Sequence, residues 1–138
     1  FREKGVRENR YIDFEWALKV CKAVEFDVRL NGDNEIVIFH DNDFKRIGNN
    51  SLKVRKATQK DIDHIFKTNK DWKPTLFNDY IDNLSDKYEW INVEIKPNRY
   101  TEQEYQIFKE ALLKLRKKTK AEIVVSSFSK NDLNFIAT

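Results

Sequence analysis

The stretch that decides the fold is Ala23-Val24-Glu25-Phe26-Asp27-Val28-Arg29-Leu30, in which apolar and charged side chains alternate. A period of two predicts a β-strand, because successive side chains of a strand point to opposite faces of its sheet. Val24, Phe26 and Val28 then share one face, and Glu25 and Asp27 share the other. Two carboxylates that point into one interior repel each other unless a cation lies between them. An edge strand with one solvated face is the alternative, and this stretch alone leaves both open.

A second predicted strand, residues 90–96, repeats the pattern. Its apolar face consists of Ile91, Val93 and Ile95, and its polar face of Asn92, Glu94 and Lys96. Glu94 would add a third carboxylate from a separate strand, which completes an oxygen-ligand set suited to Mg²⁺ or Ca²⁺. Lys96, two residues further on, could reach a phosphate oxygen as a point charge. Two such strands favour a metal site over two unrelated edge strands.

The rest of the chain alternates strands with helices. Further strands are predicted at 35–40 and 122–128, and helices at 11–22, 58–66, 75–84 and 101–115. Thr58 and Thr75 are expected as helix caps, and Thr101 with Glu104 forms a capping-box pattern. Residues 41–56 are predicted to be a loop or a small excursion. This order favours a parallel α/β sheet in one domain over residues 1–138, a length that can bury a core.

Composition narrows the classes of function. The net charge is +3, but basic and acidic residues interleave, which argues against a nucleic-acid partner. No stretch approaches the ~18 apolar residues that span a bilayer, and no signal-peptide pattern opens the chain. We therefore expect a cytoplasmic protein without stable membrane insertion. Cys21 falls on the apolar stripe of a predicted helix and is interpreted as a buried core thiol.

His40 ends the predicted strand 35–40, just before Asp41. A histidine at a strand end is commonly structural. At the carboxyl end of parallel strands it is also well placed as a general acid for a departing alkoxide. His64 falls inside a predicted helix and is expected on the surface. The sequence has no Gly-rich phosphate loop, Cys-x-x-Cys pair or Gly-x-Ser-x-Gly elbow, which argues against nucleotide kinases, zinc sites and serine hydrolases.

Six short segments occur in a recognisable order. They are Glu8-Asn9, Val24-Glu25-Phe26-Asp27-Val28, Val37-Ile38-Phe39-His40-Asp41, Pro74-Thr75-Leu76, Val93-Glu94-Ile95-Lys96 and Ser126-Ser127-Phe128. In order and spacing this series resembles the glycerophosphodiester phosphodiesterase family. The resemblance implies a TIM-type (β/α)8 barrel, of which this chain would form about half. It also implies hydrolysis of a small-molecule glycerophosphodiester to sn-glycerol 3-phosphate and an alcohol, with Mg²⁺ or Ca²⁺ as cofactor.

The resemblance also implies roles for individual residues. The metal ligands would be Glu25, Asp27 and Glu94; the general acid would be His40; the phosphate contact and further catalytic residue would be Lys96; and Asn9 would contact substrate or metal. The related phospholipase D toxins that act on sphingomyelin share the carboxylate pattern. The segments around Pro74 and Glu94 fit the glycerophosphodiester group better.

Two features depart from the family pattern. The family carries a His-Arg-Gly segment with a second catalytic histidine, which this sequence lacks, and Arg10 stands where the family usually has Thr. Four predicted strands are also too few to close a barrel, which takes roughly 250 residues. Three explanations stay open: an excerpt of a longer enzyme, a shortened homologue completed as a homo-oligomer, or a degenerate domain that binds a phosphodiester or a partner without turnover. A plain α/β scaffold without a site is a further alternative.

Overall fold

The computed structural model describes residues 14–15, 18–19, 22–96 and 98–127. Its strands are β1 (Ala23–Leu30), β2 (Ile36–Ile38), β3 (Asp43–Phe44), β4 (Asn50–Lys53), β5 (Thr75–Leu76), β6 (Trp90–Ile95) and β7 (Glu122–Ser126). Its helices are α2 (Lys45–Gly48), α3 (Gln59–Ile65), α4 (Phe77–Asn83) and α5 (Glu102–Lys118), with 3₁₀ turns at Val54–Lys56, Lys70–Trp72 and Ser85–Lys87. Asn9 and Cys21 lie outside the described residues.

The main sheet has the strand order β5-β2-β1-β6-β7. β1, β6 and β7 run parallel, but β2 is antiparallel to both of its neighbours, β1 and β5. The prediction of an all-parallel sheet is therefore wrong. The turn over residues 31–34 is too short for a crossover, and a tight turn joins only antiparallel strands. In it the side-chain oxygen of Asn31 accepts from the backbone N–H groups of Asp33 and Glu35 at 2.9 and 3.0 Å.

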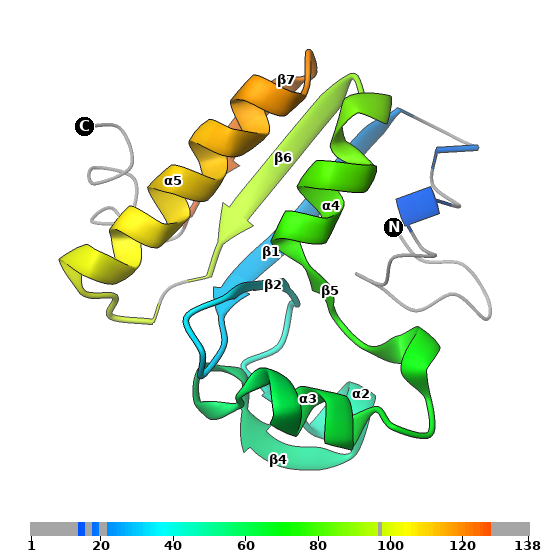
Figure 1. The fold of residues 1–138 in the computed structure, drawn as a ribbon, viewed down its shortest axis with the longest axis vertical. Helices are drawn as coiled ribbons and strands as arrows, with labels where there is room; N and C mark the ends of the chain where they lie inside the picture. The colour runs from blue at the N-terminus through cyan, green and yellow to red at the C-terminus, as the bar shows by residue number, and fades with distance from the viewer. Residues whose placement is uncertain (1–13, 16–17, 20–21, 97, 128–138) are drawn as a thin grey trace.

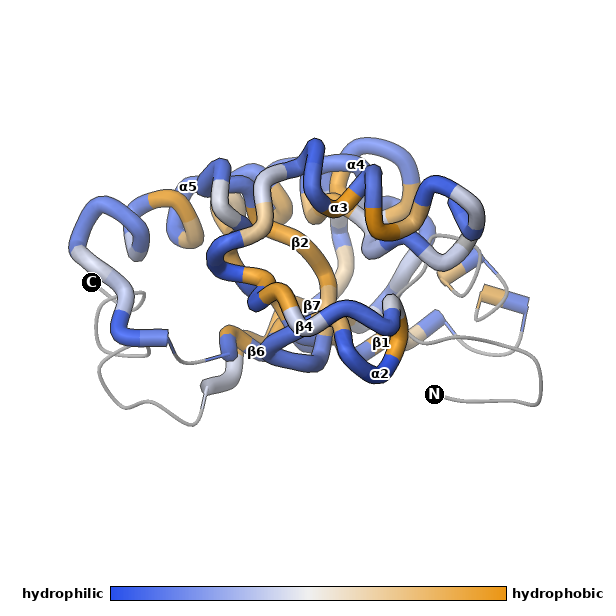
Figure 2. Tube along the Cα trace, turned by 90° about the horizontal axis from the view of Figure 1, so that it is seen from below, coloured by the Kyte–Doolittle hydropathy of each residue, from blue (hydrophilic) through white to orange (hydrophobic). Residues whose placement is uncertain are grey.

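Helices α4 and α5 cover one face of the sheet, as Figures 1 and 2 show. The apolar rows of β1 and β6 pack beneath them, and the ring of Phe26 meets that of Tyr80 edge-on at 4.8 Å between centroids. Burying one such aromatic side chain stabilises the fold by roughly 1.5–3 kcal/mol. The charged rows of β1 and β6 consequently lie on the opposite face.

The stretch 41–56 is an excursion with a small core of its own. It forms the β3–β4 hairpin and α2, which pack against α3 around Phe39, Phe44, Ile62 and Phe66. His64, on α3, is exposed as predicted. Figure 1 shows this unit beyond the C-terminal end of β1, next to β2 and β5. The excursion therefore builds a wall next to the end of β2.

Helix starts were predicted well where side-chain caps define them. Thr58 opens α3 and Thr101 opens α5, each with a complete capping box. Thr75 is the exception, because its backbone pairs with Ile38 in the sheet and the N-cap of α4 is Leu76. The pairing holds Thr75 in the sheet, so α4 begins one residue later than predicted, after an N-cap without a side-chain hydrogen bond.

Glu104 joins α5 to the excursion. Its carboxylate accepts from the Thr101 backbone at 2.8 Å and pairs with the guanidinium of Arg55. Burial by itself would raise the pKa of Glu104, but the bonds from Thr101 and Arg55 outweigh it and hold the pKa below its ordinary value. A group with a lowered folded-state pKa stabilises the fold above its unfolded-state pKa, and that stability is lost as the pH falls through the folded-state pKa.

We expect Glu104→Ala to lower the free energy of unfolding by about 1–2 kcal/mol at pH 7, because the cap and the ion pair are both lost. The deficit should shrink as the pH falls through the lowered pKa of Glu104, because the wild-type carboxylate then becomes protonated. Urea unfolding across pH measures this. Glu104→Gln is the matched control, since it keeps a capping acceptor and loses only the charge. A deficit that stays the same as the pH is lowered through the acid range would contradict the account.

Candidate active site

The polar face of β1 and β6 brings charged residues from two strands into one surface. The strands pair in register, with Asp27 opposite Glu94 and Glu25 opposite Asn92. The ladder continues one step beyond β6, since the backbone N–H of Lys96 donates to the carbonyl of Val28 at 3.1 Å. The surface therefore carries a carboxyl pair followed, one step along the strands, by the cations Arg29 and Lys96.

Asp27 and Glu94 form a hydrogen-bonded carboxyl pair. Burial first, and then the hydrogen bond and charge of Glu94, raise the pKa of Asp27 to about 6. Burial also acts to raise the pKa of Glu94, but its bonds with Lys96 and Asp27 prevail and lower it. Near pH 6 the two carboxyls therefore share a proton, as neighbouring like charges do where water is scarce.

The Lys96 ammonium group lies against this pair. Its Nζ is 2.6 Å from Oε2 of Glu94 and 3.7 Å from Oδ1 of Asp27. All three side chains are about 15–17% exposed, so the charges are only weakly screened by water. A positive charge already balances the carboxyl pair at the place where a cation would be expected.

The donor chemistry fits a hard divalent cation in part. Asp27 and Glu94 offer adjacent carboxylate oxygens whose repulsion a cation would relieve. Glu25 is exposed and lies one ladder step away, beside Asn92. Within the described part of the chain, no three His, Cys, Asp or Glu side chains gather in a cluster that could hold a metal ion. The three-carboxylate site stays a prediction.

His40 reaches this surface by a different route from the one predicted. It does not follow a parallel strand, because β2 is antiparallel to β1. The hairpin instead returns the chain beside β1, where the backbone N–H of Phe39 donates to the carbonyl of Asp27 at 3.0 Å. His40 comes close enough to lower the pKa of both Asp27 and Glu94 by its charge. The structure thus unites Asp27, Glu94 and Lys96, and it brings His40 within electrostatic range of both carboxyls.

Three residues that sequence reasoning had not assigned hold His40. Nδ1 of its ring lies 2.9 Å from Oδ1 of Asp41, and Arg46 binds both carboxylate oxygens of Asp41 at 2.9 and 3.0 Å. Arg29 donates twice to the His40 carbonyl, from Nε at 3.2 Å and Nη2 at 2.8 Å. The Arg46 bond, aided by His40 against burial, lowers the pKa of Asp41. Asp41 is therefore a carboxylate at neutral pH.

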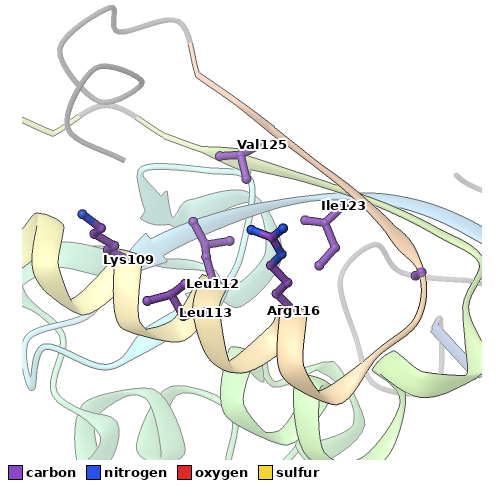
Figure 3. Close-up of a pocket in the computed structure, with 7 residues that line it drawn as sticks. Lys109, Leu112, Leu113, Arg116, Ile123 and Val125 are labelled. Carbon is purple, nitrogen blue, oxygen red and sulfur yellow. The ribbon is translucent and has the colours of Figure 1, made fainter. Parts of the chain in front are cut away.

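A groove of about 470 Å³ between α5 and β7 is a separate feature (Figure 3). Its lining is mainly apolar and comes from Lys109, Leu112, Leu113, Arg116, Ala121, Ile123 and Val125. Ile123 and Val125 pair with Ile91 and Val93, so the groove lies on the helix-covered face. It holds no carboxylate and takes no part in the site on the polar face.

The sequence matches the model of the glycerophosphoryl diester phosphodiesterase family over residues 8–138, and the chain belongs to this family. The resemblance seen in the sequence is thereby confirmed. No match was found among the curated proteins. None of the described helices is long and apolar enough to cross a membrane.

Solved structures of the same kind share the fold. A glycerophosphodiester phosphodiesterase from Thermotoga maritima is 31% identical, with a TM-score of 0.71, and the match covers 94% of this chain and 52% of that one. An Oleispira antarctica phosphodiesterase in complex with the product sn-glycerol-3-phosphate is 24% identical, with a TM-score of 0.75 and coverage of 93% and 55%. This chain therefore spans about half the length of the structures that it matches.

Removing the Lys96 ammonium group should destabilise the fold, because two poorly solvated carboxyls then lose their counter-charge. We expect Lys96→Met to lower the free energy of unfolding by roughly 1–3 kcal/mol at pH 7.5. Adding Asp27→Asn should restore part of the loss, since one repelling charge is removed. Urea unfolding of the single and double variants tests this, and a single variant as stable as wild type would refute it.

Proposed function

We propose that the polar face of β1 and β6 is the centre of a metal-dependent phosphodiesterase that hydrolyses glycerophosphodiesters to glycerol 3-phosphate and an alcohol. One observation carries the proposal: the carboxyl pair Asp27–Glu94 lies beside the cation Lys96 and within electrostatic range of the Asp41-bound His40. Family membership and the product complex of the Oleispira antarctica relative support the substrate class. The activity belongs to a protein in which the rest of the fold is present, in this chain or in an assembly.

Each residue has a task that follows from its chemistry. Hydrolysis forms a bond from a water oxygen to phosphorus and breaks the bond from phosphorus to the alcohol oxygen; the water gives up a proton, and the departing oxygen takes one up. The His40 imidazolium would donate that proton from Nε2, while Asp41 holds Nδ1. Lys96 would turn from Glu94 to a phosphoryl oxygen, where its point charge offsets developing negative charge. A divalent cation held by Asp27 and Glu94, with Glu25 as the third ligand and Asn9 as a further contact, would offset charge on the phosphoryl oxygens.

A non-catalytic domain that binds a phosphodiester is the second candidate. Lys96 already balances the charge of the carboxyl pair, and Glu25 lies one ladder step away from it. Such a domain would keep the Lys96 and Arg29 cations for phosphate and show no turnover. We also propose that a (β/α)8 barrel is closed, either by further chain or by a second copy. A cytoplasmic location is proposed as well.

Titration of Mg²⁺ and Ca²⁺ by calorimetry tests the cation site. Saturable binding is expected for this chain, and Asp27→Asn or Glu94→Gln should weaken it at least tenfold, because each removes a charged ligand. Glu25→Gln decides whether the third carboxylate takes part. Glu122→Gln is the matched control, because Glu122 lies on the same face but opposite Trp90, two ladder steps away. Folded protein without saturable binding would refute the site.

Release of glycerol 3-phosphate from glycerophosphocholine tests the reaction. We expect His40→Gln to lower kcat by roughly 10²- to 10⁴-fold, because proton transfer to the leaving group is lost. Cation binding should survive in this variant, and the His64→Gln control should keep full activity. Undiminished turnover in His40→Gln would remove His40 from the mechanism. Cation binding without turnover in any form would favour the non-catalytic candidate.

A further inference from the structure

His40 has a side chain that is 54% exposed, yet both its backbone and its ring are anchored. Its carbonyl accepts two bonds from Arg29, and its ring is bonded to Asp41. An exposed side chain loses rotational freedom when it is held, and burial does not compensate here. The ring is therefore held in one orientation although it is exposed.

The Asp41 carboxyl faces the His40 ring, and its protonation state decides which of the two groups donates the hydrogen bond between them. Arg46 donates to both carboxylate oxygens of Asp41, and the Asp41 side chain is only 18% exposed. An ionised carboxylate only accepts hydrogen bonds, so Nδ1 of His40 must be the donor. The neutral ring then carries its proton on Nδ1, the opposite of the form that predominates in free histidine. Nε2 makes no hydrogen bond to a described residue.

Local structure explains why Arg46 stands where it does. Phe44 is fully buried in the small core and fixes the chain just before α2. The Asp43 carboxylate accepts from the backbone N–H of Lys45 at 3.0 Å, and Asn49 ends the single helical turn at a φ of 50°. This turn carries Arg46 back over Asp41, five residues earlier in the sequence.

We propose that Arg46 is a positioning residue that acts on His40 through Asp41: it holds the carboxylate so that His40 is protonated on Nδ1 and presents Nε2 to the phosphodiester. The benefit to catalysis rests on the proposed function, but the tautomer is a property of the free protein. The competing view is an ordinary surface ion pair, since Arg46 is 45% exposed and such pairs contribute little. That view predicts no effect of Arg46 on the ring.

The two histidines of the chain make the test simple. Long-range ¹H–¹⁵N spectra of the imidazoles at pH 8, where an ordinary histidine is neutral, report which nitrogen carries the proton. We expect the Nδ1–H form for His40 in the wild type and a shift toward the Nε2–H form in Arg46→Gln. Arg46→Lys, which keeps the charge but not the fork, should give a smaller shift. Lys45→Gln removes a neighbouring charge and should leave the ring unchanged.

His64, on α3, is the internal reference for folding. If Arg46→Gln disturbs the His64 signals, Asp41→Asn and Arg46→Lys carry the test instead. An Nε2–H form of His40 in the wild type, or an unchanged ring in folded Arg46→Gln, would overturn the proposal.

Turnover separates this proposal from the proposed function. In an active protein, Arg46→Gln should lower kcat by roughly 10- to 100-fold with little change in KM, and Lys45→Gln should not. The Nδ1–H form without any turnover, in a protein that carries the rest of the fold, would refute the proposed function and leave the positioning role intact. Turnover together with the Nε2–H form in the wild type would support the proposed function and refute the positioning role of Arg46.

Discussion

The in-register parallel pairing of β1 with β6 is the constraint on which the site depends. It places Asp27 beside Glu94 and, one step along, sets Arg29 near Lys96. The apolar rows of the same strands bury Phe26 and Val93 under α4 and α5, so packing fixes the register. A slip of one residue would turn the charged row into the core. The packing energy of one face thus holds together like charges on the other.

Two half-buried carboxyls side by side are costly to the fold, and the molecule offsets that cost internally. Lys96 supplies positive charge, and the pair shares a proton near pH 6. Residues arranged for chemistry commonly oppose stability in this way. The excursion performs a second task, because its small core positions α2 and thereby the Arg46–Asp41–His40 chain. Residues far from the ladder therefore control the group expected to move a proton.

Sequence patterns predicted what depends on local periodicity and capping. The alternation in β1 and β6 and the capping boxes at Thr58 and Thr101 express single-strand or single-turn chemistry, and all are found. The antiparallel direction of β2 was not predicted, because the alternation of strands and helices favours a parallel sheet, whereas the short turn over residues 31–34 sets the direction of β2. Thr75 was misassigned because strand pairing is a tertiary contact that propensity does not contain.

The site was predictable to the extent that it lies on strands. That Asp27 and Glu94 share a face follows from the alternation of side chains along β1 and β6. Arg29 and Arg46, in contrast, gain their partners only through the hairpin and the turn of α2.

The most direct test of the central claim is paramagnetic broadening of backbone amide signals by Mn²⁺, a hard cation that favours carboxylates. The account predicts that the amides of Asp27, Glu94 and His40 broaden first and together, and that Asp27→Asn abolishes the effect. Broadening that spares these three amides while other parts of the chain lose intensity would contradict it.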